Sequence, residues 1–324
     1  MNWRRTRPTT GEVVRHAALF FLTVLTTFAA GIFLPVSESE YFTPALALPV
    51  SWVDYLIYIP AYILLYVFGT LANASAPLLI QSAFFSFSLL AILSAHEAGH
   101  YIACRLYGVE ASLPFFIPAP PPFPAGTFGA FIKMRAPIPY RRALFDIAVA
   151  GPLAGFIVII PVAILGISLA TPAPPLPDGG GLYFNDPLLL RAVAFVLGTD
   201  VTTSQLNGFL GAAWFGLLVT SLNLLPVGQL DGGHISYALF GERAHRRLGI
   251  AGFIFICLLA PLGWWYAGVP SNVLYAVLLL VMLRMRHPQA LDESDALGNT
   301  RIVLAIITLA VLVLSFLPFP LTVT

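Results

Sequence analysis

Long apolar runs separated by short polar segments dominate this sequence. A helix that crosses about 30 Å of hydrocarbon needs about 20 apolar residues. Such runs predict transmembrane helices at 17–35, 79–104, 143–169, 208–226, 249–268, 270–283 (a short one) and 302–319. Residues 55–72 contain Pro60 and Gly69, and we interpret them as a re-entrant or interfacial helix. Residues 187–198 carry Arg191, and the pattern leaves open whether they lie on the surface or cross the membrane.

These runs fix the predicted fold class, because lipid offers no hydrogen bonds to an exposed backbone. We expect an all-α polytopic membrane protein, a helical bundle of about seven transmembrane helices. Composition agrees: 58% of the residues are hydrophobic and 10% are charged, whereas about a quarter are charged in a typical soluble chain. The net charge of +1 gives no sign of a nucleic-acid partner, and Cys104 and Cys257 are interpreted as small core residues.

Basic residues predict the orientation, since cytoplasmic loops are enriched in Lys and Arg. Arg residues before position 16 place the N-terminus in the cytoplasm, while 36–54 and 171–186 contain no Lys or Arg and are expected outside. The first run lacks a small-residue cleavage site, so we interpret it as an uncleaved anchor, with no plastid transit peptide before it. We expect a bacterial inner membrane. The predicted parts are an N-terminal anchor with an interfacial segment (1–78), a core (79–240) and C-terminal helices (241–324).

Two islands of polar residues interrupt the apolar pattern, and the first has the pattern H-E-x-x-H. Its residues His96, Glu97 and His100 follow directly on an apolar run. The i, i+4 spacing places both imidazoles on one helical face, as two zinc ligands require. Glu97 lies beside them, where it can take a proton from an activated water. The alternative is a pair of structural histidines and a surface glutamate, but polar groups are costly inside a membrane span.

The second island, 223–234, supplies candidates for the third ligand that a catalytic zinc needs. Pro226 breaks the preceding helix, and irregular backbone at membrane depth indicates a protein-lined or water-lined cavity. Asp231 is the preferred ligand because it is a carboxylate in this broken region. His234 is the rival; it could instead hydrogen-bond a ligand or cap the next helix.

Together the islands resemble the site-2 protease family of intramembrane zinc metalloproteases. That family pairs a helix bearing H-E-x-x-H with a later Asn-x-x-Pro and Leu-Asp-Gly element, matched here by Asn223 to Pro226 and by Leu230 to Gly232. The resemblance implies that Asp231 completes a site for one Zn²⁺ ion. It places Asn223 close by, where it either hydrogen-bonds the scissile carbonyl or ties the broken backbone.

Proline-rich residues 112–142 lie between the islands and cannot form a helix. We expect a membrane-dipping hairpin with a short strand after Gly126, whose edge could pair with an unwound substrate. Gly126, Thr127, Phe128 and Gly129 are the candidate substrate-binding residues; the alternative is a structural turn. The GTFGA motif, with Asp146 and Gly151-Pro152, resembles a branch without a PDZ domain that includes plant plastid and cyanobacterial members.

The predicted function is hydrolysis of peptide bonds in or near the transmembrane segments of membrane proteins, with Glu97 as the base. A transporter or metal-handling protein could use the same polar residues as an ion pathway. A zincin acting at the membrane face is a third possibility, but the sequence has no charged soluble segment to supply its last ligand. Cobalt or manganese could replace zinc. The sequence names neither substrate nor oligomeric state.

Overall fold

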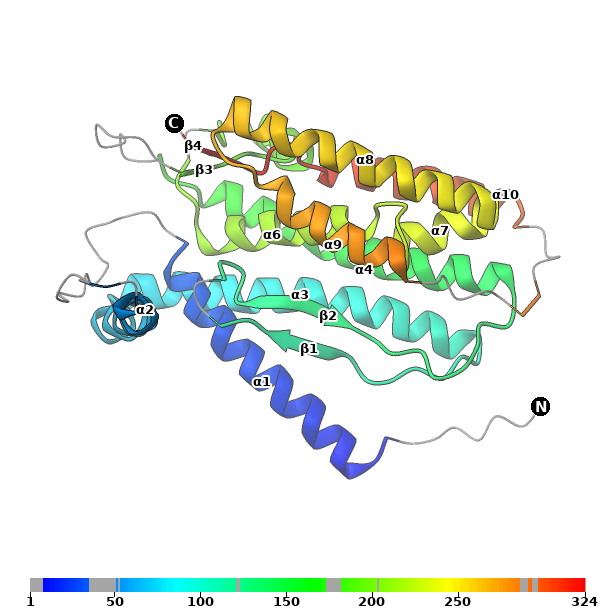
Figure 1. Cartoon of the computed structure of the whole chain (residues 1–324), viewed down its shortest axis with the longest axis horizontal. Coiled ribbons are helices and arrows are strands. Elements are labelled where there is room, and N and C mark those ends of the chain that lie inside the picture. The colour runs from blue at the N-terminus through cyan, green and yellow to red at the C-terminus, as the bar shows by residue number, and fades with distance from the viewer. Residues whose placement is uncertain are drawn as a thin grey trace.

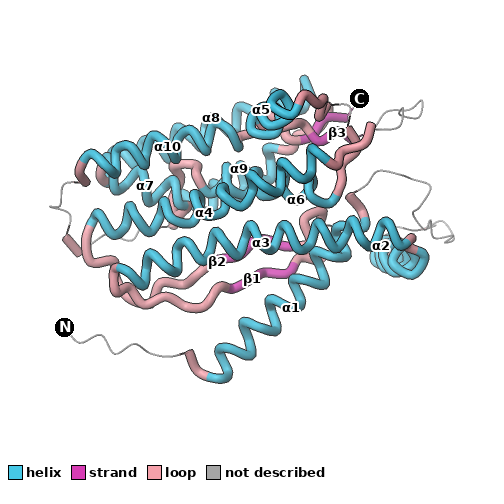
Figure 2. Tube along the Cα trace, turned by 180° about the vertical axis from the view of Figure 1, so that it is seen from behind, coloured by secondary structure: helices cyan, strands magenta, loops and turns pink. Residues whose placement is uncertain are grey.

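A computed structural model describes residues 8–34, 51, 53–120, 123–172, 182–202, 204–285, 291–292 and 297–323. Within these ranges the chain forms ten α-helices and four short strands (Figures 1 and 2). The predicted all-α membrane fold is confirmed. Five of the described helices are long and apolar enough to cross a bilayer, namely α1, α2, α3, α4 and α8.

Each predicted span corresponds to one helix, with ends that differ by a few residues. The first half contains α1 (Thr10–Ile32), α2 (Asp54–Asn73), α3 (Ala76–Leu106) and α4 (Arg141–Ser168). The second half contains α5 (Leu188–Leu197), α6 (Gly208–Asn223), α7 (Asp231–Phe240), α8 (Glu242–Ala267), α9 (Asn272–Arg284) and α10 (Asn299–Ser315). The largest differences are at two helix starts, since α1 and α8 each begin seven residues before the predicted position. Helix α6 ends three residues before Pro226, because a proline disfavours helix in the residue before it.

Helix α2 differs from the other long helices in its direction. Figure 1 shows it end-on, beside the start of α3, while α3, α4 and α8 run across the view. By length and composition alone α2 qualifies as a membrane span. Its direction nevertheless favours a helix that lies across the bundle axis, so the interfacial interpretation of 55–72 stays a prediction.

Polar caps define where several helices begin. Ser75 precedes α3, and its Oγ accepts a hydrogen bond from the Leu78 amide at 3.4 Å. Asn207 does the same for α6, its Oδ1 accepting from the Leu210 amide at 2.9 Å. Such caps satisfy amides that have no partner within the helix. In a chain this apolar such polar residues mark where these two helices start.

The three helices α3, α4 and α6 pack together at the centre, and glycines allow their close approach. A Cβ on Gly99 of α3 would overlap the backbone of Ala150 in α4. A Cβ on Gly166 of α4 would lie 2.6 Å from the amide nitrogen of Leu210 in α6. Small residues bring helices together because lipid provides no hydrophobic force between them.

Two antiparallel strands, β1 (Phe115–Pro118) and β2 (Thr127–Phe131), form the hairpin that the sequence predicts. They run beside α3 (Figure 1). Helix α1 holds β1: His16 Nδ1 lies 2.9 Å from the carbonyl oxygen of Pro114, and the rings of Phe20 and Phe116 are 4.9 Å apart. A second strand pair, β3 (Leu182–Phe184) and β4 (Leu321–Val323), joins the C-terminal segment to the loop before α5.

A polar cluster ties α10 to the core. Arg301 donates to both carboxylate oxygens of Asp146 in α4, from Nη2 at 2.6 Å and from Nε at 2.8 Å. The hydroxyl of Tyr107, just after α3, donates to the same carboxylate. The arginine and the aspartate are each only about a quarter exposed. This bidentate pair therefore joins three segments far apart in the sequence.

Candidate metal centre

The two histidines of the H-E-x-x-H motif lie together on one face of α3. Their ring centroids are 4.8 Å apart, and the Nε2 atoms of His96 and His100 are separated by 3.1 Å. Both side chains and Glu97 are buried. The i, i+4 spacing thus places both imidazoles on one helical face, as the sequence predicts, and their Nε2 atoms converge on one point.

Asp231, the first residue of α7, brings a carboxylate to the same point. Its Oδ2 lies 3.3 Å from His96 Nε2, and its Oδ1 lies 3.3 Å from His100 Nε2. Among the residues that the structure describes, these three side chains form the one group able to hold a metal ion, with ligand atoms within 4.8 Å of one another.

These separations fit zinc. Tetrahedral coordination with bonds of roughly 2.1 Å places ligand atoms about 3.4 Å apart. The observed distances between the nitrogen and oxygen atoms, 3.1 to 3.3 Å, are close to that value. Three protein ligands also leave one coordination position open, as a catalytic zinc requires. The donor set and its spacing therefore suit a catalytic rather than a closed structural site.

The orientation of His100 is fixed from behind by α4. Its Nδ1 lies 2.8 Å from the carbonyl oxygen of Ile147, so Nδ1 donates and Nε2 keeps a lone pair for a metal. Gly151, one turn further along α4, faces the imidazole so closely that a Cβ would overlap the ring. Gly155 faces His96 in the same way, with less crowding, since its Cβ would lie 3.3 Å from the His96 Cβ.

A cavity of about 200 Å³ opens beside the three ligands. Residues of α3 and of the hairpin form its wall, among them Glu97, Ala130, Phe131 and Ile132. Ile132, which directly follows β2, lines this cavity together with Glu97. The hairpin thus forms one wall of the cavity in which the predicted base lies. No sequence pattern singles out Ile132, because its side chain carries no chemistry of its own.

The structure brings Asn223 and His234 to this cavity as well. Asn223 ends α6, and its Nδ2 lies 3.4 Å from His96 Nε2. His234 is buried one turn after Asp231, yet it is outside the group of three whose atoms converge. Between them the chain turns sharply at Gly228, which has a φ of 55°, and returns to start α7. The broken helix therefore aims an amide and a carboxylate at one point.

The four candidate residues for substrate binding lie before Ala130, at the end of β2 that points away from the cavity. Gly126 has a φ of 67° and packs against the backbone of α1 at Thr26. The Thr127 hydroxyl donates to the carbonyl oxygen of Ile117 at 2.8 Å, while the Phe128 side chain is exposed. Ala130 to Ile132, rather than these four residues, line the cavity.

Sequence comparison then decides the family. Residues 84–259 match the family described as Peptidase family M50, and they make up more than half of the 324 residues. The chain belongs to peptidase family M50. The matched segment contains His96, His100 and Asp231, so the family's peptidase region includes the geometric site. The predicted membership of the site-2 protease family is confirmed.

Relatives of this M50 chain carry names that agree with the site. "Probable zinc metalloprotease EGY1, chloroplastic" of Arabidopsis thaliana is 30% identical over 324 residues, 96% of this chain and 54% of that protein. The rice protein of the same name (Oryza sativa subsp. japonica) is 30% identical over 240 residues, 72% of this chain and 40% of that protein. The chain thus spans about half, or less, of the length of these relatives. No solved structure matches it.

The contact of Gly151 with His100 leads to a test of the M50 site. We expect Gly151→Ala to weaken zinc binding by roughly 10- to 100-fold, the effect of disturbing a group that orients a ligand. The added methyl would displace the imidazole, whereas helix propensity alone favours alanine. Equilibrium dialysis of purified protein against buffered zinc measures the change. Gly155→Ala is the matched control, and equal zinc affinity of the two variants would contradict the contact.

Proposed function

We propose that this chain is an intramembrane zinc metalloprotease that hydrolyses peptide bonds in or near the transmembrane segments of membrane proteins. The observation that carries the proposal is the convergence of two imidazoles and a carboxylate at 3.1 to 3.3 Å, buried in a bundle of apolar helices. Membership in family M50 and relatives named as probable zinc metalloproteases support it.

We assign one Zn²⁺ ion to His96, His100 and Asp231. When bound, it supplies a Lewis acid that polarises a peptide carbonyl and makes a water molecule acidic near neutral pH. The protein's part is to hold the ligands and exclude bulk solvent, which α3, α4 and the loop before α7 do. We further assign residues 79–240 as the catalytic core, because all these side chains come from that segment.

Glu97 is the general base and acid of the proposed reaction. Its carboxylate lies in the cavity wall beside the ligands, where it can take the proton of the attacking water. It then passes this proton to the leaving amide nitrogen. Ile132, just after β2, lines the cavity beside this carboxylate, so the hairpin forms the wall against which Glu97 lies. The side-chain amide of Asn223 is proposed to donate to the scissile carbonyl oxygen as negative charge develops there.

The hairpin is proposed to present the substrate as an added strand. Strand β2 pairs with β1 along one edge, and its last residues line the cavity. An extended substrate can add to its other edge through backbone hydrogen bonds. Gly126, Thr127, Phe128 and Gly129 would then bind the part of the substrate further from the scissile bond. A substrate helix must unwind first, since its own hydrogen bonds shield its peptide bonds.

We propose a bacterial inner membrane as the location of the protein. The distribution of basic residues favours an N-terminus in the cytoplasm. The helices are apolar on lipid-facing sides: Phe87 of α3, Ile157 of α4 and Leu258 of α8 are all highly exposed. Substrates would accordingly be membrane proteins with a single span, reached within the bilayer.

A metal transporter is the competing function, and metal removal separates the two. In proteoliposomes with a labelled single-span protein, we expect ortho-phenanthroline to stop cleavage and added Zn²⁺ to restore it. The meta isomer, which does not chelate, is the matched control. The proposal would be contradicted if a preparation that elemental analysis shows to be free of metal still cleaved the substrate. Metal flux across the vesicles without any cleavage would favour the transporter.

A further inference from the structure

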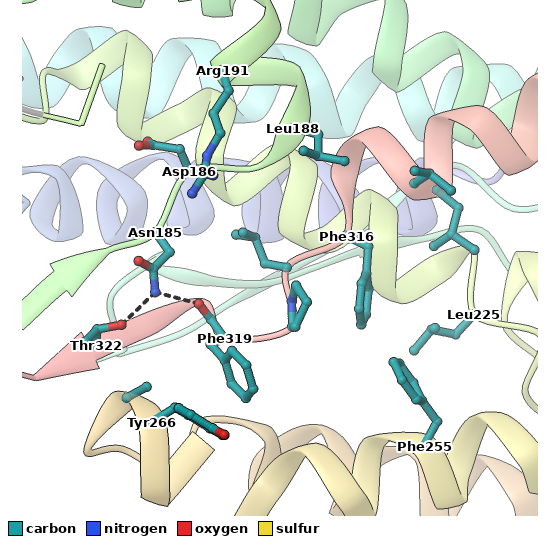
Figure 3. Close-up of a pocket in the computed structure, with 15 residues that line it drawn as sticks. Asn185, Asp186, Leu188, Arg191, Leu225, Phe255, Tyr266, Phe316, Phe319 and Thr322 are labelled. Carbon is teal, nitrogen blue, oxygen red and sulfur yellow. Dashed lines mark hydrogen bonds between the residues drawn. The ribbon is translucent and has the colours of Figure 1, made fainter. Parts of the chain in front are cut away.

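A second, larger cavity lies away from the metal centre, between the C-terminal ends of α8 and α10 and the start of α5. Its volume is about 710 Å³. Figure 3 shows its wall, with polar side chains gathered at one end and aromatic and aliphatic ones at the other. Several wall residues are strongly exposed, among them Leu188 and Val313, so the cavity opens onto the lipid-facing surface.

The polar end carries one positive and one negative side chain. Asp186 precedes α5 and Arg191 lies in its second turn, and both line the cavity. Burial raises the pKa of the Asp186 carboxyl, while the nearby Arg191 guanidinium opposes this rise. Asn185 fixes the position of this end, since its amide donates to Phe319 O and to Thr322 Oγ1, both at 2.7 Å (Figure 3).

The apolar end reaches back to the loop that precedes Asp231. Phe255 of α8 and Phe316, just after α10, face each other with ring centroids 5.9 Å apart. Beyond them lies Leu225, two residues after Asn223. The cavity therefore runs from a charged mouth, formed by Asp186 and Arg191, to the loop between α6 and α7 that precedes Asp231.

Aromatic residues place the charged mouth at the membrane interface. Trp264, Trp265 and Tyr266 end α8, and all three are highly exposed. Trp and Tyr are enriched at headgroup depth, where a ring is half in lipid and half in water. Tyr266 itself lines the mouth. Arg191 and Asp186 thus lie where lipid headgroups lie, and the apolar end lies where acyl chains lie.

The volume limits what the cavity can hold. A helix about 10 Å wide that spans 30 Å fills roughly 2,400 Å³, more than three times this cavity of about 710 Å³. Pockets of roughly 300–1,000 Å³ hold small molecules. An acyl chain with its headgroup fits such a space, whereas a substrate helix does not.

We propose that this cavity binds one bilayer phospholipid with a zwitterionic, amine-bearing headgroup. Its acyl chain lies against the rings of Phe255 and Phe316 and touches Leu225, Arg191 binds the phosphate, and Asp186 binds the ammonium group. The opposite charges at the mouth match the opposite charges of this headgroup. The lipid fills the space beside the loop between α6 and α7. This proposal does not depend on the proposed protease function.

Native mass spectrometry of the purified, delipidated full chain tests the site. With dioleoylphosphatidylethanolamine as the probe, we expect one lipid to bind per chain. Arg191→Gln removes the charged hydrogen bonds to the phosphate, and Leu188→Trp fills the mouth. Each should weaken binding roughly tenfold. Arg243→Gln, at the other end of α8, and Val196→Trp, exposed on α5, are the matched controls and should leave binding unchanged.

Two further probes separate the parts of the headgroup. Dioleoylglycerol lacks the phosphate and dioleoylphosphatidylglycerol lacks the amine, so both should bind at least several-fold more weakly. Asp186→Asn should remove the preference for phosphatidylethanolamine over phosphatidylglycerol. Equal binding of all three lipids, or equal binding by Leu188→Trp and Val196→Trp, would overturn the proposal.

Discussion

Glu97→Gln should abolish cleavage while leaving zinc bound. Glu97 lies beside the ligands without being one of the three that converge, so the metal keeps its full set. The carboxamide retains the shape of the side chain but cannot accept a proton from water. General acid–base groups contribute typically 10²- to 10⁴-fold to rate, and we expect a loss of at least that order. Cleavage in proteoliposomes and zinc content by elemental analysis are measured on the same preparation.

A matched control makes the Glu97 result specific. Glu242→Gln makes the same chemical change in the exposed first turn of α8 and should cleave like the unmodified chain. Zinc retained together with full cleavage in Glu97→Gln would refute the assignment of the base. Loss of zinc would instead show that Glu97 is a ligand.

Asp231→Ala should remove the metal, and with it all cleavage. Its two oxygens each lie 3.3 Å from a histidine nitrogen, and no other described carboxylate belongs to the group whose ligand atoms converge. Loss of a group that merely orients a ligand costs 10- to 100-fold in affinity, and we expect loss of the ligand itself to exceed about 100-fold. Equilibrium dialysis against buffered zinc measures this.

His234→Ala is the partner experiment, since His234 was the rival third ligand. It lies one turn further along α7, lines the same cavity and is buried. We expect this variant to retain stoichiometric zinc. The reverse pattern, with zinc retained in Asp231→Ala and lost in His234→Ala, would transfer the third ligand to His234.

Helix positions were predictable because the signals for them are local. Apolar runs locate each span, and α3 begins within three residues of its predicted start. The two imidazoles were equally predictable, since a spacing of four residues fixes their relative position on any helix. Asp231 lies 131 residues after His100, and no local spacing relates the two. Its proximity follows from the packing of α6 and α7 against α3 and α4, and only the family resemblance indicated it.

Some features of the site left no trace in the sequence. Ile132 lines the cavity beside Glu97, yet an isoleucine after a short strand carries no chemistry that would mark it. Gly151 and Gly155 each make room for one of the two histidines of the H-E-x-x-H motif, a role that depends on the absence of a side chain. Likewise, nothing in the sequence pairs Arg301 with Asp146. These features depend on which helices become neighbours, and hydrophobic patterning alone does not determine that.

The Arg301–Asp146 pair has a consequence for the order of assembly. A ribosome delivers Asp146 to the membrane 155 residues before Arg301. During that interval the carboxylate near the start of α4 lacks its guanidinium partner, and a charge at membrane depth is costly. Until α10 is inserted, the Tyr107 hydroxyl is the one partner that the described part of the chain can offer this carboxylate. The arrival of α10 therefore completes the neutralisation of a charge on a helix already in place.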